Sequence, residues 1–124
     1  MTFWKKRKPL AVTDVPNATQ ATYWAGPSGT SWITHQDDMD ALLRSVNQAL
    51  LKRAGNVNGL DVLDIGCGTG ALSLDFAAAG ASVTASDISK PLLEKTAERG
   101  KGLIETLLAD AQTTIWDKSF DLVV

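Results

Sequence analysis

The sequence predicts an α/β protein with a doubly wound, Rossmann-like parallel sheet, and two observations support this. From residue 60 onward, short apolar segments alternate with segments of helical periodicity, as in strands joined by crossover helices. The first apolar segment runs into the glycine-rich stretch 66–70, and a helical pattern begins at Ala71. A strand, a glycine turn and a helix in this order form a nucleotide site, because glycines adopt positive φ and let a ligand approach the backbone.

Two segments precede the alternating pattern: an irregular tail over residues 1–16 and a helical segment over 17–55. A short helix is expected over 17–25, with Asn17 as its cap, and the run 26–29 should break it. A longer helix is expected over 31–53. Its apolar residues share one stripe at helical spacing: Met39, Leu42, Leu43, Val46 and Leu50.

Residues 56–124 are predicted to form the first half of the nucleotide-binding domain. The expected strands cover 60–65, 82–87, 103–109 and 120–124, and the expected helices cover 71–79 and 89–99. The first strand is apolar on both faces, which is typical of a central parallel strand. The sequence stops inside the fourth strand, and a buried parallel strand needs neighbours on both sides. We therefore expect an incomplete sheet and a chain that is a fragment.

Composition narrows the function classes. With 44% hydrophobic and 21% charged residues and a net charge of −2, the chain has an ordinary globular composition and gives no electrostatic reason to bind nucleic acid. No run reaches the roughly 18 apolar residues of a membrane helix, so a cytoplasmic protein is expected. One cysteine and one histidine supply neither a metal cluster nor a nucleophile with its base. The composition leaves the oligomeric state open.

The glycine run alone does not identify the nucleotide. Gly66, Gly68 and Ala71 satisfy the dinucleotide fingerprint, and Asp87 follows 21 residues after the first glycine, at the end of the second strand. That acid is placed to accept hydrogen bonds from ribose hydroxyls, and it is also a candidate helix cap. The spacing fits NAD and other adenosine cofactors equally well.

Asp64, two residues before Gly66, favours a cofactor without phosphate. A carboxylate about 5 Å from a phosphate charge would cost roughly 3 kcal/mol at an effective dielectric constant near ~20. S-adenosylmethionine instead carries an ammonium and a sulfonium. We expect Asp64 to orient the glycine loop or to meet the ammonium, and Asp110, at the end of the third strand, to accept the adenine amino group.

At these positions the chain resembles the class I S-adenosylmethionine-dependent methyltransferases. The resemblance covers residues 60–124 through four motifs in the family's order: 62–70, 86–89, 108–112 and 119–124. It implies that Asp87 binds the ribose and that Asp110 and the backbone N–H of Ala111 contact the adenine. Ile88 is placed to pack on the adenine face or in the core. The expected cofactor-binding residues are Asp64, Gly66, Cys67, Gly68, Gly70, Asp87, Ile88, Asp110 and Ala111.

The segment 23–32 and the helix after it are similar to the N-terminal part of small-molecule methyltransferases of the quinone-biosynthesis type. In those enzymes this part covers the cofactor like a lid. Trp24 and Trp32 are therefore candidates to close over the site, although packing is the more usual role of large aromatic residues. We assign His35 no general-base role, Trp116 a place in loop packing, and Cys67 the role of a small loop residue rather than a reactive thiol.

The resulting prediction is methyl transfer from S-adenosylmethionine to a small-molecule acceptor. The sulfonium activates the methyl group, so the protein mainly supplies proximity and alignment, and we assign no catalytic residue. In the family the acceptor site is built largely after the fourth strand, so the 124 residues alone are expected to lack turnover. Two alternatives remain: an NAD-dependent oxidoreductase half-domain and a non-catalytic nucleotide-binding module.

Overall fold

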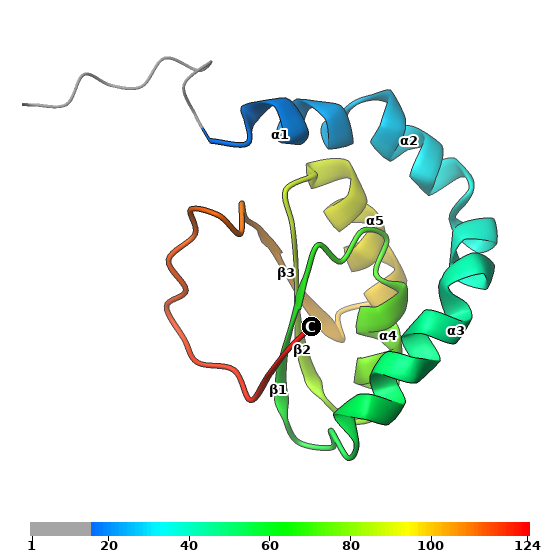
Figure 1. The fold of residues 1–124 in the computed structure, drawn as a ribbon, viewed down its shortest axis with the longest axis vertical. Coiled ribbons are helices and arrows are strands. Elements are labelled where there is room, and N and C mark those ends of the chain that lie inside the picture. Colours follow the sequence, from blue (N-terminus) through cyan, green and yellow to red (C-terminus); the bar gives the residue numbers. More distant parts are fainter. Residues whose placement is uncertain (1–15) are drawn as a thin grey trace, which may run out of the picture.

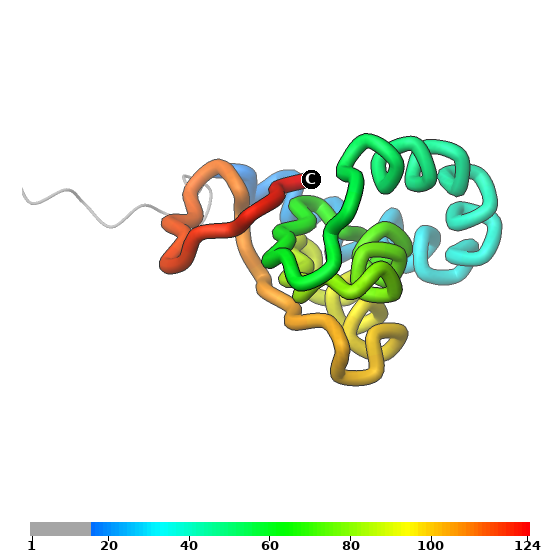
Figure 2. Tube along the Cα trace, turned by 90° about the horizontal axis from the view of Figure 1, so that it is seen from below, coloured from blue at the N-terminus to red at the C-terminus, as the bar shows by residue number. Residues whose placement is uncertain are grey.

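The structure, a computed structural model, describes residues 16–124, so the expected tail over 1–16 lies almost entirely outside it. Helices α3, α4 and α5 lie on one side of a twisted sheet, and the connection 109–121 lies on the other (Figures 1 and 2). The elements are α1 (Ala18–Ala25), α2 (Pro27–Thr34), α3 (Gln36–Ala54), β1 (Asp61–Ile65), α4 (Ala71–Ala78), β2 (Ser82–Asp87), α5 (Lys90–Gly100), β3 (Ile104–Leu108) and β4 (Leu122–Val123).

The sheet confirms the predicted fold class. Its four strands are all parallel, in the order β3-β2-β1-β4. The first strand is central, as its apolar character on both faces predicted. Val62 pairs with Val83, and Val83 with Ile104, so the three side chains share one face of the sheet. The short strand β4 lies at the edge beside β1.

The helical N-terminal segment differs from the prediction in its boundaries. The helix expected over 31–53 is divided at His35 into α2 and α3. The run 26–29 does end α1, but Pro27 then occupies the first turn of α2, where its missing N–H costs nothing and its fixed φ suits a helix. The two short helices approach each other so closely at Gly29 that a Cβ there would lie 1.9 Å from the carbonyl oxygen of Trp24.

Asn17 occupies the N-cap position of α1, as predicted, but its side chain does not cap the helix. The residue adopts a left-handed conformation (φ 59°) and makes no capping hydrogen bond. Its Nδ2 donates instead to Oδ1 of Asp110, at 2.9 Å. This contact joins the start of α1 to the end of β3.

The hydrophobic core fills the space between the sheet and the helices on its covered side. Its buried members are Val57, Val62, Phe76, Val83, Ala85 and Ile104. Helix α3 reaches this core only through Leu51 and Ala54, near its C-terminal end. Of its predicted apolar stripe, Met39 is half-buried and the other four residues are exposed, with Leu42 at 69% and Val46 at 52%. No helix in the described range 16–124 is both long and apolar enough to cross a membrane.

Replacing Phe76, which is completely buried, by alanine should lower the free energy of unfolding by about 3–5 kcal/mol, because both burial and packing are lost. Chemical denaturation monitored by circular dichroism measures the change. Leu42→Ala is the matched control, with an expected effect below about 0.5 kcal/mol. Equal losses in the two variants would contradict the placement of the core.

Candidate functional site

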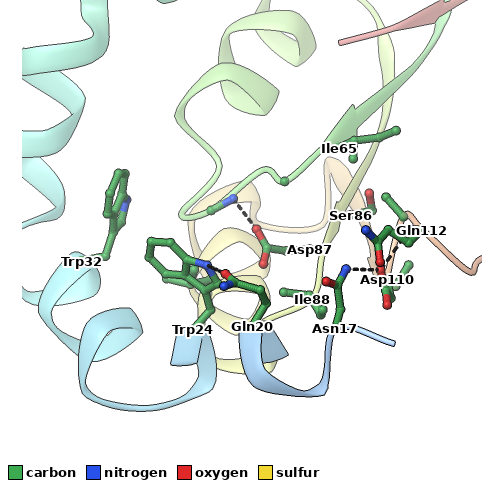
Figure 3. A pocket seen from close by; sticks show the side chains of 15 residues that line it. Asn17, Gln20, Trp24, Trp32, Ile65, Ser86, Asp87, Ile88, Asp110 and Gln112 are labelled. Atoms are coloured by element: carbon green, nitrogen blue, oxygen red, sulfur yellow. Dashed lines mark hydrogen bonds between the residues drawn. The ribbon is translucent and has the colours of Figure 1, made fainter. Parts of the chain in front are cut away.

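A cavity of about 460 Å³ opens at the carboxyl ends of the strands, where open α/β sheets bind ligands. The glycine loop and the ends of β2 and β3 form one wall, and α1 and α2 form the other (Figure 3). Six of the predicted site residues line it: Gly66, Gly68, Asp87, Ile88, Asp110 and Ala111. The other three are outside this lining: Asp64 precedes the loop in β1, and Cys67 and Gly70 are loop residues that face α5.

The glycine loop adopts the positive φ angles that its sequence predicted, 73° at Gly66, 58° at Gly68 and 86° at Gly70. Four of the five N–H groups of the loop 66–70 bond within the protein. Those of Gly66 and Cys67 donate to the carbonyl oxygen of Ser86 at 2.8 and 2.9 Å, and that of Gly70 donates to the carbonyl oxygen of Cys67. A phosphate-binding loop presents such groups to its ligand. The observed loop therefore favours a ligand without phosphate at this point.

Helix α5 holds the loop from behind. Thr96 Oγ1 donates to the carbonyl oxygen of Gly68 at 2.9 Å, and Arg99 Nη1 donates to that of Thr69 at 2.8 Å. Arg99 Nη2 also pairs with Asp40 Oδ2 in α3, at 2.5 Å. Sequence reasoning missed Thr96 and Arg99, because a helix surface residue carries no local signal of the loop that it contacts.

Asp87 joins the end of β2 to the loop. Its Oδ2 accepts from the N–H of Gly68 and its Oδ1 from that of Ser89, both at 2.9 Å. An ionised carboxylate has about four lone-pair sites, so acceptor capacity remains for ligand hydroxyls. The helix-capping role belongs to Ser89, whose Oγ accepts from the N–H of Leu92.

Asp64 lies under the loop and is only 4% exposed. Its Oδ2 accepts a 2.6 Å hydrogen bond from Ser73 Oγ of α4. Burial raises the pKa of Asp64, the hydrogen bond from Ser73 opposes that rise, and the charge of Asp87 adds to it. Of the two roles expected for Asp64, this contact fits the orientation of the loop rather than a contact with an ammonium in the cavity.

Cys67 and Gly70 pack against α5. Burial, and then the charges of Asp64 and Asp87, raise the pKa of the Cys67 thiol to about 12, so the thiol stays protonated at neutral pH. A Cβ on Gly70 would lie 2.7 Å from Cγ2 of Thr96. Glycine is therefore required here both by its positive φ and by its close approach to the helix.

Asp110 lies at the end of the cavity formed by the segment after β3. Its Oδ1 accepts from Asn17 Nδ2 at 2.9 Å and from the N–H of Gln112 at 3.0 Å. Within residues 16–124 its Oδ2 accepts no hydrogen bond and is available to a ligand amino group. Asn17 and Gln20 of α1 also line the cavity, which the sequence did not indicate.

Trp24 and Trp32 both line the cavity and pack edge-to-face, with ring centroids 6.1 Å apart. The N-cap residue of α5, Ser89, donates its Oγ–H to the carbonyl oxygen of Trp24 at 2.8 Å and so joins α5 to α1. His35 Nδ1 lies 2.9 Å from the carbonyl oxygen of Ser31, and His35 is not part of this cavity's lining. Trp116 packs against Phe120, as expected of a loop residue.

A parallel sheet with a glycine loop after β1 and an acid ending β2 defines a Rossmann-like domain with an adenosine-type nucleotide site. Residues 62–124 match the family described as methyltransferase domain, which is half of the chain. The chain belongs to this methyltransferase family.

The chain is similar to several curated methyltransferases and spans about a third of their length. It is 36% identical over 72 residues to the magnesium-protoporphyrin O-methyltransferase of Synechocystis sp., covering 58% of this chain and 29% of that protein. It is 38% identical over 79 residues to the demethylmenaquinone methyltransferase of Tropheryma whipplei, covering 62% and 33%. It is 44% identical over 95 residues to the malonyl-[acyl-carrier protein] O-methyltransferase of Erwinia pyrifoliae, covering 77% and 33%.

Solved structures show the same fold. The magnesium protoporphyrin IX methyltransferase of Synechocystis with bound SAH (S-adenosylhomocysteine) superposes with a TM-score of 0.70 at 25% identity, covering 86% of this chain and 56% of that one. A DhpI–SAH complex superposes with a TM-score of 0.67 at 27% identity, covering 85% and 50%. These matches confirm the Rossmann-like methyltransferase fold predicted from the sequence.

The thiol of Cys67, the single cysteine of the chain, should react slowly with iodoacetamide. Its pKa of about 12 lowers the thiolate fraction near pH ~8 by about a thousandfold relative to an ordinary cysteine. We expect alkylation at least a hundredfold slower than in the chain unfolded by guanidinium, as followed by mass spectrometry. Labelling within about tenfold of the unfolded rate would contradict the inert role.

Proposed function

We propose that this chain is the cofactor-binding part of an S-adenosylmethionine-dependent methyltransferase that acts on a small-molecule acceptor. One observation carries the proposal. The cavity presents two carboxylates, Asp87 and Asp110, and among the described residues 16–124 no lysine or arginine lines it. An anionic cavity of this kind repels a polyphosphate and attracts a cation, and the internally bonded glycine loop strengthens this preference.

The residues fit the cofactor along the whole cavity. Asp110 Oδ2 is available to the adenine amino group, the N–H of Ala111 adds a second polar contact, and Ile88 offers an apolar side chain to the ring. Asp87 retains lone pairs for the ribose hydroxyls, and Gly68 lets the ligand approach the loop backbone. Asp64 precedes the loop and is held by Ser73 of α4. Cys67 and Gly70 lie within the loop and pack against α5.

Methyl transfer from this cofactor requires little of the protein beyond binding and alignment. The bound cofactor supplies a methyl group already activated by a sulfonium. The side chains around the cavity would hold that cofactor in one orientation and restrict water beside it. This fits a site in which the described residues form no nucleophile–base pair.

Relatives and composition supply the remaining features. The similar proteins carry names that state methyl transfer to a porphyrin, a demethylmenaquinone or a malonyl-acyl carrier protein, which supports a small-molecule or carrier-bound acceptor. The net charge of −2 supports an acceptor other than nucleic acid. We propose a cytoplasmic location because no run of the sequence reaches the length of an apolar membrane helix.

Calorimetric titration tests the proposal. After circular dichroism establishes that the chain is folded, S-adenosylmethionine and NADH are titrated separately. We expect binding of S-adenosylmethionine and no detectable binding of NADH. A folded chain that prefers NADH would overturn the proposal in favour of the oxidoreductase alternative. Methyl transfer to small-molecule acceptors is then assayed with a protein that spans the full length of the relatives. Turnover would indicate an enzyme, and cofactor binding without turnover would indicate a non-catalytic binding module.

Asp87→Ala should weaken S-adenosylmethionine binding by roughly 10- to 150-fold, because a hydrogen bond to a charged group contributes about 1.5–3 kcal/mol. Isothermal calorimetry measures the change. Asp117→Ala is the matched control, because Asp117 is an exposed acid outside the lining of the cavity. An unchanged affinity for the Asp87 variant would mean that the ribose binds elsewhere.

A further inference from the structure

Trp32 places a polar atom beside the glycine loop. Its Nε1 lies 3.8 Å from the point that a Cβ on Gly68 would occupy, and the indole lines the cavity (Figure 3). The neighbouring Trp24 donates its Nε1–H to Gln20 Oε1 at 3.2 Å. Among residues 16–124 Trp32 Nε1 has no such acceptor. An indole N–H is a donor only, so at this point the cavity offers a ligand one hydrogen bond to an acceptor.

The polar groups follow one another along the cavity in a fixed order. Asp110 lies at one end, Asp87 lies in the middle beside the N–H of Gly68, and Trp32 lies at the opposite end (Figure 3). A ligand with its adenine at Asp110 and its ribose at Asp87 therefore extends its third part toward Trp32.

In S-adenosylmethionine that third part is an amino acid, which carries a carboxylate. A carboxylate in this cavity is repelled by the two aspartates, and no lysine or arginine of the part of the chain that the structure describes lines the cavity to pair with it. The N–H groups of Gly66, Cys67, Gly68 and Gly70 already have acceptors within the protein. The indole N–H of Trp32 is thus an uncommitted side-chain donor beside Gly68, at the loop end of the cavity.

We propose that Trp32 is a specificity-determining residue, whose indole N–H donates a hydrogen bond to the carboxylate of the cofactor's amino acid part. The inference rests on the proposed function, because it takes S-adenosylmethionine as the ligand. It gives Trp32 a role apart from packing, and it distinguishes Trp32 from Trp24, whose N–H is engaged within α1. The site thereby recognises the amino acid end of the cofactor as well as its nucleoside.

The experiment compares two ligands that differ by the carboxylate alone: S-adenosylhomocysteine and its decarboxylated analogue, S-adenosyl-3-thiopropylamine. Calorimetry gives the affinity of each ligand for the unaltered chain, for Trp32→Phe and for Trp24→Phe. Phenylalanine keeps an aromatic ring and removes the N–H. Circular dichroism establishes that both variants remain folded.

We expect Trp32→Phe to weaken S-adenosylhomocysteine binding by about ten- to a hundredfold, in keeping with a lost hydrogen bond to a charged group. The analogue should change by less than about twofold. Trp24→Phe, the matched control, should change both affinities by the same factor. An equal loss of both ligands in Trp32→Phe, or no loss, would overturn the inference while leaving the cofactor assignment intact. Failure of the unaltered chain to bind S-adenosylhomocysteine would overturn the proposed function and the inference together.

Discussion

The hydrogen bonds between the glycine loop and β2 determine the shape of the site. The carbonyl oxygen of Ser86 accepts from two successive loop N–H groups, and the carboxylate of Asp87 accepts from a third. These bonds turn the loop onto the end of the neighbouring strand, while Thr96 and Arg99 fix its carbonyl groups from α5. The loop can therefore be approached closely, but four of its five backbone donors are already satisfied. The ligand must be recognised by side chains around the loop.

Those side chains come from two parts of the chain with different roles. The strand ends supply the acids, Asp87 and Asp110, which meet at one edge because parallel strands all end there. The helices α1 and α2 supply Asn17, Gln20 and the two tryptophans. The first group fixes where a nucleoside can lie. The second encloses the cavity and adds the donors that the strand ends lack.

Sequence reasoning worked where a feature is local. The strand β2 was predicted with its observed bounds, and the three positive φ angles of the loop follow from its glycines. It failed where a contact joins distant segments. Nothing near Asn17 indicates that its side chain bonds to Asp110, and nothing near Arg99 indicates its contact with Thr69. Periodicity likewise did not indicate that the long predicted helix is divided at His35, where the backbone leaves the helical conformation and α2 packs against α5.

Helices α1 and α2 enclose the cavity without belonging to the hydrophobic core of the domain. Helix α1 has no buried residue, α2 has only Gly29, and neither helix contributes to the hydrophobic core. Two hydrogen bonds tie this pair to the strand ends, Asn17 to Asp110 and Ser89 to Trp24. Both helices also pack against α5, and α3 is tied separately through the ion pair between Arg99 and Asp40. The enclosure of the cavity therefore depends on polar contacts and on packing against α5, whereas the sheet depends on the buried core.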